Sequence, residues 1–116
     1  MELVFFRVTH EKGGQEKIVI VNLVLHENGK QVFGNCVGTD GVTVLVSAIN
    51  KAASDLSGRD LPEPVNPHFV HWQRGGGEFV FFIEGEEQRI FVPDEMDSLF
   101  GTAEAFVGHL NKEVNK

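Results

Sequence analysis

The sequence predicts an α+β fold built from duplicated β-β-β-α units, with a largely antiparallel six-stranded sheet and two helices on one face. Two observations carry this prediction. Short β-rich segments separated by turn signals occur three at a time, and each set of three is followed by a segment with helical periodicity. The chain has 116 residues, so we expect a single domain, residues 1–116, with one hydrophobic core.

The first half, residues 2–58, contains three predicted strands and one helix. The Asn28-Gly29 pair after the second strand is typical of a two-residue hairpin turn. Thr39 or Asp40 is the expected N-cap of the helix, and Gly58 is the expected left-handed residue at its end. The strands are predicted at 2–9, 17–26 and 31–37, and the helix from the spacing of Val42, Leu45, Val46, Ile49, Ala53 and Leu56.

The second half, residues 68–116, repeats this order after a proline-rich connection at 59–67. Thr102 is the expected N-cap of its last helix. Two pairs of short segments also correspond in sequence, which favours an internal duplication, although any two β-β-β-α units share hydrophobic spacing. The strands are predicted at 68–74, 79–83 and 88–92; the paired segments are Gln31-Val32-Phe33 with Arg89-Ile90-Phe91, and Ala48-Ile49-Asn50-Lys51 with His109-Leu110-Asn111-Lys112.

Both faces of the predicted sheet are apolar, because alternate residues of a strand point to opposite faces and both sets contain large apolar side chains. Two helices cover one face only, so something else must cover the other. The free energy of burying such side chains favours a homodimer. A closed barrel or strongly coiled sheet is the alternative. The candidate interface residues are Leu3, Phe5, Ile18, Ile20, Phe79 and Phe81.

Composition and charge disfavour several classes of partner. Seventeen Asp and Glu residues against ten Lys and Arg give a net charge of −7, and the basic residues form no cluster, so nucleic acid is not the expected partner. No apolar run reaches the roughly 18 residues of a membrane span. Cys36 is the only cysteine, which excludes an internal disulfide and fits a reducing compartment. We therefore expect an acidic cytoplasmic protein.

The sequence predicts neither a catalytic motif nor a metal site, and no cofactor. His68 and His71 form an HxxH pair, but a spacing of three on a strand places them on opposite faces, where one ion cannot reach both. Cys36 has no CxxC partner and no adjacent histidine, so burial is the expected role of this thiol.

Two features are candidates for ligand binding. The Gly38-Thr39-Asp40-Gly41 turn places backbone amides at a helix N-terminus, which can receive an anionic or carboxylate group. Capping alone also explains this turn, and Asp40 would repel an anion and favour an ammonium group. The second candidate is Trp72, which could be a ligand platform, an interface anchor or a core residue.

Residues 21–53 resemble part of the allosteric domain of 2-isopropylmalate synthases, above all in Gly34-Asn35-Cys36-Val37-Gly38-Thr39-Asp40-Gly41-Val42. That family has a glycine-rich turn entering a helix. Its domain is a pair of β-β-β-α units that dimerises and binds an amino-acid effector, so the resemblance implies this topology here. Gly41-Val42 stands where that family usually has Gly-Pro, and we expect no attached catalytic domain, so the resemblance bears on topology and not on activity.

These observations favour a non-enzymatic binding or regulatory module that acts as a homodimer on a protein or small-molecule partner, for example as an inhibitor or immunity-type protein. One alternative is single-stranded nucleic-acid binding on an aromatic sheet face made by Phe5, Trp72, Phe79 and Phe81. The other is a small enzyme whose site forms between subunits from His71, Asp40 or Glu84.

Overall fold

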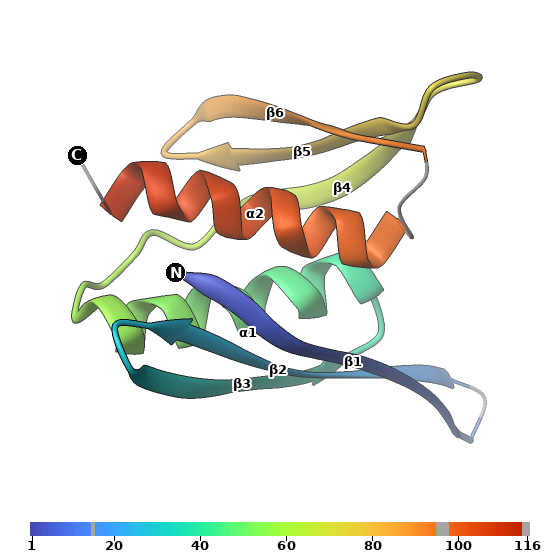
Figure 1. Cartoon of the computed structure of the whole chain (residues 1–116). Helices are drawn as coiled ribbons and strands as arrows, with labels where there is room; N and C mark the ends of the chain where they lie inside the picture. The colour runs from blue at the N-terminus through green and yellow to red at the C-terminus, as the bar shows by residue number, and fades with distance from the viewer. Residues whose placement is uncertain (15, 95–97, 115–116) are drawn as a thin grey trace.

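The computed structural model describes residues 1–14, 16–94 and 98–114. It contains two three-stranded antiparallel sheets with two helices between them (Figure 1). The first half consists of β1 (Glu2–Gly13), β2 (Glu16–Glu27), β3 (Lys30–Gly38) and α1 (Gly41–Ser57). The second consists of β4 (Val65–His71), β5 (Gly77–Ile83), β6 (Glu86–Val92) and α2 (Ser98–Val114).

The α+β class and the repeated β-β-β-α order are confirmed, but the single six-stranded sheet is wrong. The strands form the separate sheets β1-β2-β3 and β4-β5-β6. The physical reason lies in α1, where Val44, Ala48 and Ala52 are buried in addition to the predicted stripe. A helix that is apolar around most of its circumference has to be covered on several sides. It therefore packs against β2 and β3 on one side and against α2 and β4 on the others.

One hydrophobic core joins the two halves. On the first sheet, Val21, Leu23 and Leu25 of β2 face the helices and are fully buried. On the second sheet, Phe79 and Phe81 of β5 hold Phe106 of α2 against them in edge-to-face contacts. Since the helices lie between the sheets, each sheet has an inner face in this core and an outer face directed away from it (Figure 1).

Local sequence patterns predicted most of the turns and helix ends correctly. Asn28 and Gly29 both have positive φ, at 51° and 80°, as the predicted two-residue hairpin requires. Asp40 occupies the N-cap of α1, and Gly58 is left-handed at its end with φ 69°. Thr102 does not begin a helix. It lies inside α2 and donates its hydroxyl to the carbonyl oxygen of Ser98 at 2.6 Å.

The connection between the halves is shorter than predicted. β4 begins at Val65, inside the predicted 59–67 connection, and a register irregularity separates Val65 from His68. Asn66 lies in this irregularity with φ 52°. A bulge of this kind accommodates Pro67, which has no amide hydrogen to give to a neighbouring strand.

Candidate functional site

The outer face of the first sheet carries two largely apolar rows, each running across all three strands. Phe5, Val24 and Phe33 are paired across β1, β2 and β3, and Thr9, Ile20 and Val37 are paired in the same way. The side chains on the edge strand β3 are the most exposed, with Phe33 at 81% and Val37 at 61%, while Phe5 on β1 is at 49%. Large apolar side chains gathered on one face mark an interaction surface.

A polar row separates the two apolar rows. It consists of Arg7, Asn22 and Asn35, which are paired across the same three strands. The amides of Asn22 and Asn35 each offer donors and an acceptor, so they can pair with another polar surface. The face is therefore patterned apolar, polar, apolar along the strands.

Half of the predicted interface residues lie on this face. Phe5, Ile18 and Ile20 share it, whereas Leu3 pairs with the fully buried Leu25 and packs against the core instead. Phe79 and Phe81 are fully buried. They are wrong as surface candidates, because β5 is the central strand of the second sheet and these side chains face Phe106 of α2.

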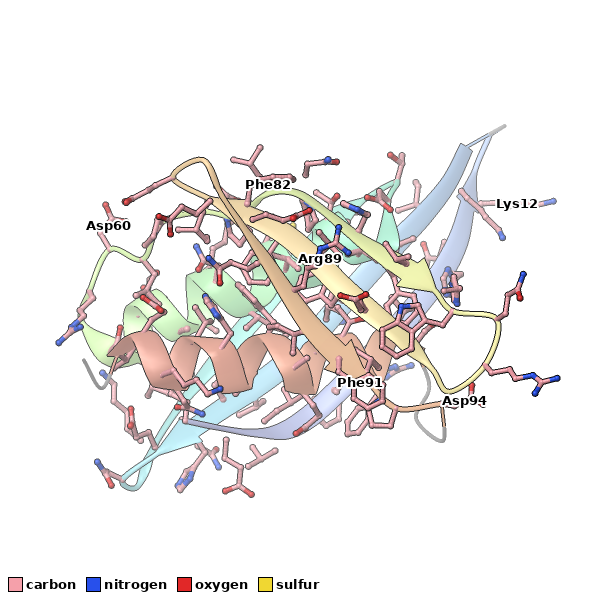
Figure 2. The ribbon with its side chains drawn as sticks, turned by 90° about the horizontal axis from the view of Figure 1, so that it is seen from above. Lys12, Asp60, Phe82, Arg89, Phe91 and Asp94 are labelled. Carbon is pink, nitrogen blue, oxygen red and sulfur yellow. The ribbon has the colours of Figure 1, made fainter. Side chains whose placement is uncertain are left out.

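The outer face of the second sheet combines aromatic and charged groups. Trp72 stacks at a tilt on Phe91 with ring centroids 5.4 Å apart, and its Nε1 donates to Glu78 Oε1 at 3.1 Å. Arg89 lies near the middle of this face (Figure 2), 3.6 Å from Glu78 Oε2 and 3.1 Å from Glu87 Oε1. Trp72 is thus a surface residue rather than a core residue.

The guanidinium group of Arg89 is already engaged. The hydrogen bond and the charge of Glu87 raise the pKa of Arg89 above its ordinary value, and Glu78 adds to this effect. Arg89 therefore stays charged at any working pH, but its charge is balanced by two carboxylates on the same surface. An incoming phosphate would have to compete with both.

The Gly38–Gly41 turn and Trp72 are not brought together. The turn leads into α1 between the sheets, whereas Trp72 lies on the outer face of the second sheet. Asp40 caps no backbone amide with its side chain; its Oδ2 accepts from the hydroxyl of Thr43 at 2.5 Å. A carboxylate at this helix start disfavours the anion site expected there.

Gly38 has a packing role in this turn. A Cβ at position 38 would lie 2.7 Å from Cγ2 of Val44, which is closer than van der Waals contact allows. Close approach of the turn to the first turn of α1 explains this glycine.

The residues of the two alternative sites, for nucleic-acid stacking and for catalysis, also lie far apart in the fold. Of the four aromatic residues considered for nucleic-acid stacking, Phe5 and Trp72 lie on different sheets, and Phe79 and Phe81 are buried. His71, Asp40 and Glu84 belong to β4, the N-cap of α1 and the β5–β6 turn. Within the described ranges, no three His, Cys, Asp or Glu side chains converge as metal ligands. No helix in the same ranges has the length and apolarity to cross a membrane.

Comparison with known proteins adds no relative. No family model matches the chain, and neither the curated proteins nor the solved structures contain a match.

Proposed function

We propose that this protein is a non-enzymatic binding or regulatory module that acts as a homodimer, with the outer face of the first sheet as the dimer interface. The observation that carries the proposal is the exposure of Phe5, Phe33 and Val37 in two cross-strand rows on that face. Burying a large apolar side chain is worth roughly 1.5–3 kcal/mol. Several such side chains together offset the ordering costs of association.

The pattern of the face suits a second copy of the same chain. A two-fold axis parallel to β2 would place β1 of one protomer over β3 of its partner. Phe5 would then face the partner's Phe33, and Thr9 would face the partner's Val37. Arg7 would face the partner's Asn35 rather than another arginine, and Asn22 would meet its own copy. Apolar rows would meet apolar rows, and the polar row would pair with itself.

This arrangement leaves the outer face of the second sheet free for a different partner. Trp72 and Phe91 form a half-exposed aromatic pair there, next to the Glu78–Arg89–Glu87 ion pairs. Aromatic and arginine side chains are enriched where proteins bind one another. The repeated β-β-β-α order is also what the resemblance to the allosteric domain of 2-isopropylmalate synthases implies, and in that family the domain dimerises and regulates.

The interface is tested by light scattering over a dilution series at moderate salt. The wild-type chain is expected to have twice the mass of 12.9 kDa. Phe33→Lys places a charge in an apolar row and is expected to weaken dimerisation about 100-fold, an effect of hot-spot size. Its thermal unfolding should be that of a folded monomer, because residue 33 is exposed within one chain.

Phe91→Lys is the matched control. Phe91 corresponds to Phe33 in the second half and is also exposed, but it lies on the other sheet. We expect this variant to remain dimeric. A monomeric wild type would overturn the proposal, and so would a Phe91→Lys variant that dissociates while Phe33→Lys does not.

A further inference from the structure

The edge strand β6 lacks the features that protect the edges β1 and β4. It pairs with β5 on one side only, and its register runs without irregularity from Glu86 to Val92. Both β1 and β4 carry a register irregularity, and β4 also contains Pro67. Bulges and prolines keep further strands from pairing with an edge. β6 is therefore open to an added strand.

The turn before β6 determines which of its backbone groups face this open edge. Glu84 and Gly85 form a two-residue turn with φ of 51° and 84°, so the flanking Ile83 and Glu86 are a hydrogen-bonded pair. Bonded and non-bonded pairs then alternate along the antiparallel ladder. The residues whose amide and carbonyl groups point away from β5 are Glu87, Arg89 and Phe91. Within the described chain, no backbone group outside β5 pairs with them.

A groove of about 470 Å³ lies beside this edge, between β6 and α2. Gln88 and Ile90 line it from the strand, and their side chains share the inner face of the sheet. Ala105 and Gly108 line it from the helix, and a Cβ added at Gly108 would meet nothing within 4 Å. The small helix residues leave room for the inward side chains of an added strand.

The corresponding edge strand of the first sheet, β3, is arranged differently. A Cβ at Gly34 would lie 2.7 Å from the carbonyl oxygen of Ala48 in α1. The helix thus lies directly against β3, whereas α2 leaves a gap beside β6. Of these two regular edges, β6 is the one that adjoins a groove.

Charge varies along β6 and the groove. Near the start of β6, Glu86 and Glu113 line one cavity. On the outer face, two carboxylates share the single guanidinium of Arg89, which leaves a surplus negative charge next to Glu87. Lys112 of α2 offsets part of the acidic charge in the groove. The other end of the groove is apolar, where Ile90 and Ala105 face each other across it. A complementary segment is therefore apolar at one end and basic at the other.

We propose that β6 and this groove bind an extended segment of a partner protein, which joins the second sheet as an antiparallel strand. The segment is apolar in its N-terminal half, beside Ile90, and basic in its C-terminal half, beside Glu86 and Glu87. Its backbone pairs with the open edge of β6 (Figure 2), and its alternate side chains enter the groove. In this mode of recognition the main-chain hydrogen bonds give affinity and the side-chain pockets give specificity.

The inference rests on the proposed role of the chain as a binding module, because it names the partner of that module. It does not depend on dimerisation. The dimer interface is the outer face of the first sheet, whereas β6 belongs to the second sheet (Figure 1).

An NMR titration of the isotope-labelled chain with the peptide acetyl-Thr-Val-Thr-Val-Lys-Lys-amide at physiological salt tests the proposal. We expect saturable shifts of the amide signals of Glu87, Arg89 and Phe91. In the antiparallel register the second threonine faces Arg89 and exchanges both backbone hydrogen bonds with it. N-methylation of this threonine removes one of them and places a methyl group against the strand, so affinity should fall at least about tenfold.

The matched control peptide is N-methylated on the second valine, whose amide points away from β6. It should bind as the unmodified peptide does. On the protein side, Gly108→Leu fills the groove and should also weaken binding at least about tenfold. Glu104→Leu adds the same side chain at an exposed position of α2 that does not line the groove, and it should bind normally.

Three results would overturn the proposal. The first is the absence of saturable shifts in β6, and the second is equal binding of the two N-methylated peptides, because charge alone would then explain the attraction. The third is wild-type affinity in Gly108→Leu. Light scattering on the same samples reports dimerisation separately. A monomer that binds the peptide would overturn the dimer alone, and a dimer that does not bind it would overturn the strand addition alone.

Discussion

Phe106→Ala is expected to lower the free energy of unfolding by about 3–5 kcal/mol, the usual cost of truncating a buried phenylalanine. Phe106 is fully buried. Its ring centroid lies 6.0 Å from that of Phe79 and 5.5 Å from that of Phe81, edge-to-face in both cases. Phe79 and Phe81 are themselves stacked at 4.8 Å. Removing the ring leaves a cavity between α2 and the second sheet, and both strand residues lose their contact with Phe106, while Phe81 keeps its edge-to-face contact with His109 of α2.

The loss is measured by urea unfolding at equilibrium, with Phe91→Ala as the control. Phe91 is half exposed and contacts only the ring of Trp72 among the aromatic pairs of the described chain. Its truncation should cost about 1 kcal/mol or less. Equal losses in the two variants would show that α2 is not packed on the second sheet through Phe106.

The strand and helix order was predictable because local patterns determine it. The β-branched run of β2, the Asn28-Gly29 turn and the left-handed Gly58 are signals that need no tertiary context. The start of α2 was not predictable from caps. Thr102 has the chemistry of an N-cap, but within a helix a threonine hydroxyl can equally bond to the carbonyl four residues earlier, as it does to Ser98.

The division into two sheets could not be read from alternation alone. Both faces of β2 and β5 are apolar in sequence, and this pattern by itself predicts one sheet with an uncovered second face. The decisive signal was in α1, whose Val44, Ala48 and Ala52 extend the apolar stripe around the helix. Given a helix buried on several sides, two sheets around it become the simpler arrangement.

The candidate surface residues were also predictable only in part. Phe5, Ile18 and Ile20 were placed correctly on one face because strand alternation sets their direction. Phe79 and Phe81 were predicted on an exposed face and are buried. Strand alternation tells which residues share a face, but it does not tell which face the helices cover. The acceptor of Asn50 had no signal in sequence. In the structure the amide of Leu61 donates to Ser54 Oγ, and Asn50 Oδ1 has no hydrogen-bond partner among the described residues.

Gly34→Val is expected to lower the free energy of unfolding by about 3 kcal/mol through overpacking. Gly34 lies on the inner face of β3, paired with Leu23. A Cβ at this position would lie 2.7 Å from the carbonyl oxygen of Ala48 and 3.0 Å from Cβ of Ala52. The carbonyl belongs to the backbone of α1 and cannot rotate away, so either the helix or the edge strand β3 must move. Gly34→Ala introduces the same Cβ and should destabilise by a smaller amount.

Gly108→Ala is the control that separates the overpacking at position 34 from the general effect of replacing a glycine. Gly108 is exposed in α2, and an added Cβ would meet nothing within 4 Å. Alanine should therefore stabilise the helix by about 0.5–1 kcal/mol. Both changes are measured by urea unfolding under the conditions used for Phe106→Ala. If Gly34→Val were as stable as the wild type, α1 could not lie as close to β3 as the structure places it, because a contact with helix backbone is relieved only by moving the helix or the strand.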